Sequence, residues 1–205
     1  MAQIKLTYFD INGGRGEPIR LAFHLGNIAF EDNRFNFAQF PEIKKSAPLH
    51  KVPVMQLDGK VITQSNAMLR YAGKLAHLYP ESAEAALFCD EILDAIEDAT
   101  NALIDTFGLE GDALKSARLS YTDKWLVPYL VWLEQKYASN NGDYFIGEHI
   151  SIADLKAYVW IKGIMSGSFD YINDDVVSNN TPQLALFCQT IEALPAINLY
   201  YQERA

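Results

Sequence analysis

The 205-residue chain is long enough for one large domain or two small ones, and its 49% apolar and 21% charged residues are those of an ordinary globular protein. A net charge of −9 argues against binding to nucleic acid or to an anionic membrane surface, because both need a basic patch. No apolar run is long enough to span a membrane and no leader pattern opens the chain, so we expect a cytoplasmic protein.

The first 79 residues alternate between short strand patterns and helices. Residues 3–10, QIKLTYFD, alternate strictly and predict a strand with Ile4, Leu6 and Tyr8 on one face. A glycine-rich segment follows, and Pro18 then opens a helix whose apolar side chains keep helical spacing. The next pattern, FEDNRF, predicts a second strand.

The turn signal Asp58-Gly59, flanked by two apolar runs, predicts a β-hairpin. A helix over residues 65–79 follows it, with an apolar stripe of Met68, Leu69, Ala72 and Leu75. The order βαβ and then ββα implies that parallel and antiparallel pairs share one sheet. We therefore predict that residues 1–79 form an α/β, thioredoxin-like domain with a mixed four-stranded sheet.

From residue 80 onward the chain carries no strand pattern, so residues 80–205 are predicted to form an all-α domain. Residues 83–107 predict a long amphipathic helix whose apolar face carries Phe88, Ile92, Ile96, Ala99, Leu103 and Phe107. Residues 113–138 predict another, kinked at Pro128 and anchored by Trp125, Tyr129, Trp132 and Leu133. Ser151 and Asp154 have the spacing of a capping box before a third helix.

The two cysteines, Cys89 and Cys188, fall inside apolar helical patterns and form no CxxC pair. We expect them to be small buried side chains without dithiol redox chemistry. The four histidines show no ligand spacing, so no metal site is predicted.

Two features of the hairpin do not suit a plain hairpin. Pro53 stands at the entrance to its first strand, where a central strand excludes proline. A cis peptide after Val52 would turn the backbone N–H and C=O of Val52 outward, toward an extended peptide-like ligand. Gln64-Ser65 stands where the hairpin meets the next helix, and amides at a helix start bind carboxylates or phosphates. The alternatives to a binding site are purely structural: Pro53 would be a proline in an edge strand, and Ser65 would cap the helix.

Tyr8 ends the first strand and is expected to point into the glycine-rich segment. Most strand tyrosines are simply packed, but a hydroxyl that faces a cleft can donate a hydrogen bond to an anion. A thiolate stabilised in this way has a pKa lowered from about 8.5 toward neutrality. Arg15 would strengthen the effect electrostatically.

The chain resembles the cytosolic glutathione S-transferases over essentially its whole length. The matching stretches, in the family's order and spacing, are LTYFDINGGRGEPIRLAF, FPEIKKSAPLHKVPVMQLDGKVITQSNAMLRYAGK and FIGEHISIADL. The resemblance is strongest to the tyrosine-type, sigma-like classes, which include glutathione-dependent prostaglandin D synthases. It implies a homodimer that uses glutathione as co-substrate, without a metal, to conjugate hydrophobic electrophiles for detoxification. The helical domain would form much of the electrophile site.

The resemblance also implies roles for individual residues. Tyr8, aided by Arg15, would hydrogen-bond the glutathione sulfur, and Val52, before the family's cis-proline Pro53, would pair with the cysteinyl part. The other glutathione contacts implied are Gln64 and Ser65 at the γ-glutamyl end, Phe40, Lys44 and Lys51 at the glycyl end, and Asp98 reaching the γ-glutamyl amine across a dimer interface. The electrophile would contact Phe9, Gly14, Asp105 and Trp160.

Three departures from the family pattern bear on these roles. The loop over residues 10–17 is one residue longer than in typical relatives, and Phe40 replaces a tryptophan that would donate an indole N–H. Some classes of the family carry a key aromatic residue of the dimer interface near Leu49 and His50. No phenylalanine, tyrosine or tryptophan stands at either position here, so a polar, sigma-like dimer interface is expected. Without the resemblance, Asp98 would be assigned to a solvated helix face. A glutathione-dependent isomerase and a non-enzymatic, crystallin-like protein are the alternative functions.

Overall fold

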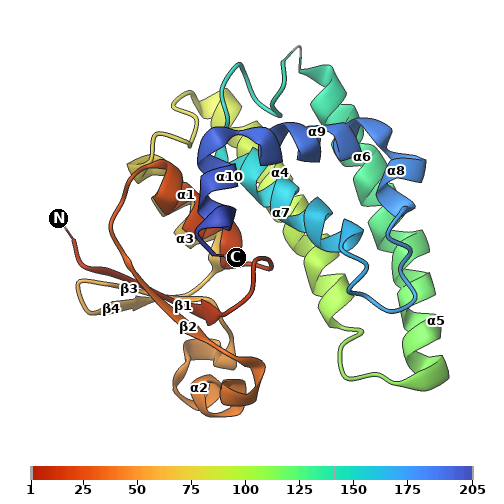
Figure 1. The fold of residues 1–205 in the computed structure, drawn as a ribbon, viewed down its shortest axis with the longest axis horizontal. Coiled ribbons are helices and arrows are strands. Elements are labelled where there is room, and N and C mark those ends of the chain that lie inside the picture. The colour runs from red at the N-terminus through yellow and green to blue at the C-terminus, as the bar shows by residue number, and fades with distance from the viewer. Residues whose placement is uncertain (1, 141, 205) are drawn as a thin grey trace. The chain divides into compact units, whose positions relative to one another are not determined.

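The computed structural model describes residues 2–140 and 142–204, and the chain divides into two compact units (Figure 1). One unit combines residues 1–79 with residues 195–205, and the other spans residues 80–194. The division expected from the sequence placed residues 195–205 with the helical domain. Their helix instead packs on the first unit, where the Ala196 carbonyl lies 3.1 Å from Nε2 of His24.

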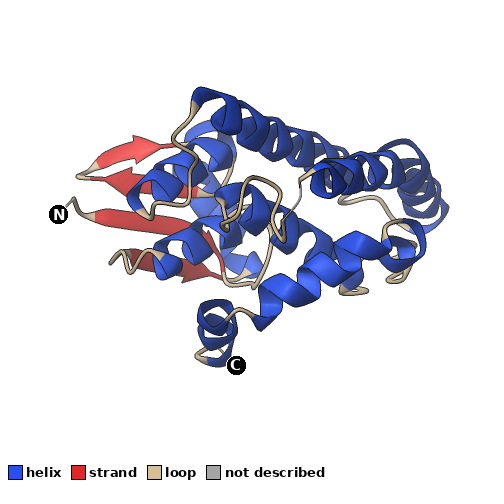
Figure 2. Ribbon diagram, turned by 90° about the horizontal axis from the view of Figure 1, so that it is seen from above, coloured by secondary structure: helices blue, strands red, loops and turns tan. Residues whose placement is uncertain are grey.

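The first unit contains a mixed four-stranded sheet, as predicted (Figure 2). Its elements are β1 (Ile4–Phe9), α1 (Glu17–Leu25), β2 (Glu31–Phe35), α2 (Phe40–Ser46), β3 (Val54–Leu57), β4 (Lys60–Ile62), α3 (Ser65–Leu75) and α10 (Pro195–Gln202). The strand order is β2-β1-β3-β4. β1 pairs parallel with β2 and antiparallel with β3, and β3 pairs antiparallel with β4.

Side chains of β1 alternate between buried and partly exposed, and those of Ile4, Leu6 and Tyr8 are buried in the core of this unit. Helix α1 packs against α3 and α10. The apolar stripe predicted for α3 is buried up to Ala72, but Leu75, the last residue of the helix, is 42% exposed. The prediction was wrong at Leu75, where the helix ends.

Helix α2 was not predicted from the sequence. It lies between two 3-10 turns, Phe37–Gln39 and Pro48–His50, in the connection from β2 to β3. No residue of α2 is buried, so it has no apolar stripe by which sequence periodicity could reveal it.

The described residues of the second unit form helices joined by loops, with no strand among them, in agreement with the prediction. Its elements are α4 (Ala83–Ile104), α5 (Gly111–Tyr121), a π-helical turn (Thr122–Leu126), α6 (Val127–Ser139), α7 (Ile152–Met165), α8 (Val176–Asn180) and α9 (Pro182–Ala193). Within the described residues, no helix combines the length and the apolar character needed to cross a membrane.

The apolar face predicted for α4 is correct in its middle and wrong at both ends. Ile92, Ile96, Ala99 and Leu103 are buried, but Phe88 is 45% exposed and Phe107 is 54% exposed. Phe107 lies beyond the end of the helix, so the helical period no longer fixes the direction of its side chain.

The helix predicted over residues 113–138 is divided by the π-helical turn. Pro128 has no N–H to donate, and the wider turn immediately before α6 accommodates it. The turn shifts the helical phase, so Trp125, predicted as an anchor, is 38% exposed, whereas Leu126 and Leu130 are fully buried.

Both cysteines are free and buried, as predicted. Burial raises the pKa of the Cys188 thiol to about 12, so that thiol is protonated at neutral pH. Protonation removes the nucleophilic form of Cys188.

Candidate functional site

Three connections of the first unit meet at one end of the sheet. Thr7 of β1 pairs with Val54 of β3, and Met55 of β3 pairs with Ile62 of β4. Because both pairs are antiparallel, the end of β1, the start of β3 and the end of β4 share this edge. The sheet therefore brings Tyr8, the Val52–Pro53 peptide and the Gln64-Ser65 pair to the same end.

Tyr8 is 6% exposed, and its hydroxyl oxygen accepts a hydrogen bond of 3.0 Å from the backbone N–H of Arg15. The guanidinium carbon of Arg20 lies 5.7 Å from the centroid of the Tyr8 ring. The sequence suggested an electrostatic role for the Arg15 side chain, whereas this hydrogen bond comes from its main chain. An N–H directed at a hydroxyl oxygen polarises the O–H and makes it a stronger donor.

Residues 10–16, which we call the Tyr8 loop, pass directly over the tyrosine ring. A Cβ atom built on Gly14, whose φ is +66°, would lie 2.5 Å from the Tyr8 hydroxyl oxygen. One built on Gly16 would lie 2.3 Å from Cδ1 of the same ring. Glycine is required at these two positions because the backbone approaches the ring too closely for any side chain.

For the glutathione conjugation that the resemblance implies, we expect Gly16→Ala to lower kcat/KM by about 10- to 100-fold, because the added methyl group would displace the ring of Tyr8. The contacts at Gly16 are with Cβ, Cγ and Cδ1, which cannot swing away as the far end of a flexible side chain can. Gly13→Ala in the same loop is the matched control, since a Cβ there meets nothing within 4 Å. Equal kcat/KM values for the two variants would show that this close contact has no catalytic importance.

The peptide bond between Val52 and Pro53 is cis, as the family resemblance implied and as one of the two interpretations of the sequence allowed. Gln64, at the start of α3, has φ 72° and ψ 103°, a rare conformation for a residue other than glycine. Gln64 forms no side-chain capping bond, and Ser65 is the first helical residue and is 8% exposed. Ser65 is therefore not a conventional N-cap, and such strained backbone is typical of functional sites.

The two lysines assigned to the glycyl end of glutathione lie close together in the chain, on and just after α2. Lys44 and Lys51 are both exposed, and neither forms an ion pair with another described residue. The neighbouring Lys45, by contrast, pairs with Glu42 at 2.7 Å. Phe40 begins α2 and packs against Phe9, with 5.1 Å between the ring centroids.

These features fit the chemistry of glutathione, which carries two carboxylates and one ammonium group. Two exposed lysines can bind one carboxylate, and the first amides of α3 can bind the other. The ammonium group would require a carboxylate. None of the residues of the first unit that were predicted for the site carries one.

The remaining predicted residues belong to the second unit. Asp98 is exposed on α4, and its negative charge adds to burial in raising the pKa of Tyr129. Asp105 is exposed at the C-cap of α4. Trp160 on α7 is half-buried, and its indole N–H is buried without a hydrogen-bond partner among the described residues.

A buried ion-pair network, not predicted from the sequence, lies behind Tyr8. Arg20 and Glu17 on α1 are both fully buried and form an ion pair at 3.2 Å. Arg20 also pairs with Asp32 of β2 at 3.0 Å, and Asp32 pairs with Arg34 at 2.6 Å. The spacing of Glu17 and Arg20, three residues apart on one helix, was the available signal.

Comparisons with known proteins identify the family of the chain. The family models described as "Glutathione S-transferase, N-terminal domain" and "Glutathione S-transferase, C-terminal domain" match residues 4–74 and 97–204. Glutathione S-transferase 1 of Ascaris suum is 32% identical, with 100% of this chain and 98% of that protein covered. Hematopoietic prostaglandin D synthase of Gallus gallus is 28% identical, with 100% and 98% covered.

Among solved structures, that of prostaglandin synthase D of Nilaparvata lugens matches with a TM-score of 0.86 and 26% identity, over 99% of this chain and 98% of that one. The two family models together account for most of the chain, and the 32% identical relative spans all of it. The chain belongs to the glutathione S-transferase family.

Proposed function

We propose that the protein conjugates glutathione to hydrophobic electrophiles and that Tyr8 activates the thiol. The observation that carries the proposal is the buried Tyr8 hydroxyl, hydrogen-bonded by the Arg15 N–H, at the end of the sheet that also holds the cis Val52–Pro53 bond. A hydroxyl polarised in this way stabilises a thiolate and lowers the pKa of the thiol. The thiolate is the nucleophilic form.

Glutathione would be held by groups that complement its charges. Lys44 and Lys51 would bind the glycyl carboxylate, with Phe40 beside them, and the start of α3 with Gln64 and Ser65 would bind the γ-glutamyl carboxylate. The backbone of Val52 would pair with the cysteinyl amide. Asp98 of the partner subunit in a homodimer would bind the γ-glutamyl ammonium group.

In the reaction, a bond forms between the sulfur and an electrophilic carbon. A leaving group departs with its electron pair, or, when the substrate is an alkene acceptor, a proton from water completes the addition. Phe9, Gly14, Asp105 and Trp160 are the residues we propose for contact with the electrophile. The proposed role is detoxification in the cytoplasm.

An ultraviolet titration of the glutathione thiolate in the presence of the purified protein tests the proposal. We expect the midpoint to fall about 1–2 pH units below the ordinary thiol value of ~8.5. A panel of electrophiles should then show consumption of glutathione. An unshifted midpoint would overturn the assignment and favour a non-enzymatic, crystallin-like protein.

A glutathione-dependent isomerase is the second candidate, because a relative that spans the whole chain is named a prostaglandin D synthase. An isomerase releases the sulfur again at the end of each cycle, so glutathione is not consumed. A shifted thiolate midpoint, together with substrate turnover at a constant glutathione concentration, would therefore identify the isomerase.

A further inference from the structure

We propose that Arg20 and Arg204 are positioning residues for thiol activation, because they fix the Tyr8 loop from its two sides. The inference rests on the proposed function, since it concerns the pKa of the thiol that Tyr8 would stabilise. It adds two residues outside the glutathione contacts, one buried in α1 and one just beyond α10.

Arg20 holds the start of the loop from inside. Its side chain is fully buried, and its two terminal nitrogens donate to the carbonyls of Phe9, at 3.0 Å, and Ile11, at 3.2 Å. These carbonyls lie on either side of Asp10, where the chain leaves β1. Arg20 therefore binds the backbone at the point where the strand ladder stops.

Arg20 is itself held in place by two carboxylates. Its Nε donates to Asp32 of β2 at 3.0 Å, and Nη1 donates to Glu17 of α1 at 3.2 Å. The charge of a buried guanidinium is tolerable only when it is paired in this way. A lysine at this position has one ammonium group and cannot serve two carbonyls and two carboxylates in a planar arrangement.

Arg204 holds the outer side of the loop. Its Nε donates to the side-chain oxygen of Asn12 at 2.8 Å, and Nη2 lies 3.7 Å from the Asp10 carboxylate. Its guanidinium carbon lies 5.5 Å from the Tyr200 ring centroid, and Arg34 joins the hydroxyl of that tyrosine to Asp10. Helix α10 is thereby connected to both Asp10 and Asn12.

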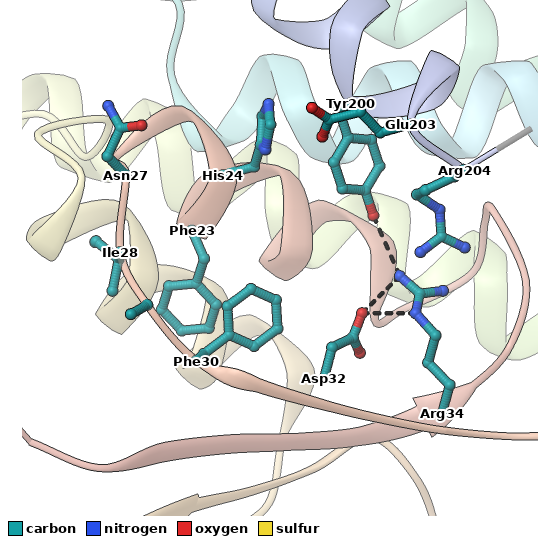
Figure 3. A pocket seen from close by; sticks show the side chains of 11 residues that line it. Phe23, His24, Asn27, Ile28, Phe30, Asp32, Arg34, Tyr200, Glu203 and Arg204 are labelled. Carbon is teal, nitrogen blue, oxygen red and sulfur yellow. Dashed lines mark hydrogen bonds and ion pairs between the residues drawn. The ribbon is translucent and has the colours of Figure 1, made fainter.

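Figure 3 shows Arg204, Tyr200 and Arg34 among the residues that line a pocket of the first unit. Tyr200, Arg34 and Arg204 lie together at one end of a pocket of about 570 Å³, away from the apolar end that Phe23 and Phe30 form. Arg34 lies between Asp32 and Tyr200, to which it is joined by dashed lines. The groups that hold the loop thus come from β2 and α10 as well as from α1.

The held segment leads directly to the contacts with Tyr8. Two residues after Asn12 the chain reaches Gly14, and then Arg15, whose N–H donates to the Tyr8 hydroxyl at 3.0 Å. Residues 10–16 form neither a helix nor a strand, so no regular ladder fixes that N–H. A displacement of Asp10 or Asn12 moves the donor and changes how strongly Tyr8 stabilises a thiolate.

The test is the thiolate midpoint of bound glutathione, measured by ultraviolet titration, in Arg204→Met and Arg20→Lys. We expect the midpoint to rise in both, and kcat/KM at neutral pH to fall about three- to tenfold for Arg204→Met and more for Arg20→Lys. Lys136→Met is the matched control. It also removes one charge from a salt bridge, Lys136–Glu91 at 2.8 Å, but in the helical unit, and it should leave the midpoint unchanged.

A double-mutant cycle separates positioning from a general loss of stability. Asn12→Ala should raise the midpoint by no more than Arg204→Met does, because it removes only one of the contacts of Arg204. The double variant should show the midpoint of Arg204→Met alone, because both changes break the same hydrogen bond. Arg204 is partly exposed, so its variant should fold even if Arg20→Lys does not.

The possible failures are distinguishable. An unshifted midpoint in the unaltered protein would remove the proposed function itself. If the midpoint is shifted in the unaltered protein and has the same value in Arg204→Met, only the positioning role is overturned. The positioning role is also overturned if the variants have a lower melting temperature or a lower affinity for glutathione but the same midpoint as the unaltered protein.

Discussion

Tyr8→Phe should lower kcat/KM for conjugation at neutral pH by about 10- to 100-fold, while the affinity for glutathione changes less than about twofold. The change removes one hydrogen bond to a charged sulfur, which is worth about 1.5–3 kcal/mol. Because that bond favours the thiolate over the thiol, its loss raises the pKa of bound glutathione by about 1–2 units. The carboxylates of glutathione keep their partners, so binding is retained.

Two measurements check this expectation: the thiolate midpoint and the pH profile of kcat/KM, which should move together toward higher pH. Tyr71→Phe is the matched control, since it makes the same change in the same unit on α3, outside the predicted site. Unchanged turnover in Tyr8→Phe would show that another group activates the thiol.

Asp154→Ala should lower the free energy of unfolding by about 3–5 kcal/mol, a large part of the 5–15 kcal/mol that is typical of a whole protein. The Asp154 carboxylate is fully buried and accepts three hydrogen bonds. One comes from the backbone of Phe145 at 2.8 Å, and two come from the backbone and hydroxyl of Ser151 at 2.7 Å each. Removing the carboxylate leaves these donors buried without an acceptor.

Urea unfolding of the variant should show a lower midpoint at an unchanged slope. Ser82→Ala is the control. Ser82 caps α4 by accepting a hydrogen bond of 3.1 Å from Ala85, but it does so at the surface, and its loss should cost only about 1 kcal/mol. Equal losses in the two variants would mean that Asp154 acts only as an ordinary helix cap.

Local signals in the sequence predicted much of the fold. The alternation of Ile4, Leu6 and Tyr8 identified the central strand, and Asp58-Gly59 identified the hairpin that makes the sheet mixed. The capping box is formed by Ser151 and Asp154 as their spacing indicated. Each of these features depends on residues within a few positions of one another.

Features that depend on tertiary structure were not predicted. The phase shift at the π-helical turn exposes Trp125, although the helical period alone places it inside. Charged residues such as Glu17 and Arg20 are normally read as exposed, and only the position of Asp32 in the adjacent strand makes their burial stable.

The candidate site was likewise predicted only in part from the sequence. The residue types at Tyr8, Pro53, Gln64 and Ser65 indicated a site for a peptide-like anion. The sequence could not show that Arg15 would contribute through its backbone N–H. Nor could it show that Gly14 and Gly16 would lie so close to the Tyr8 ring that no side chain fits at either position. Both depend on how far the loop is folded back over β1.

The first unit is built from two stretches of chain separated by the whole of residues 80–194. On the ribosome, the thioredoxin-like part is therefore made early but cannot acquire α10 until the helical unit has been synthesised. At about 5–20 residues per second, this delay is on the order of ten seconds. During that time the α10-facing side of α1, including His24, has no covering helix, so the nascent chain presents a surface that a chaperone could bind and the finished protein does not.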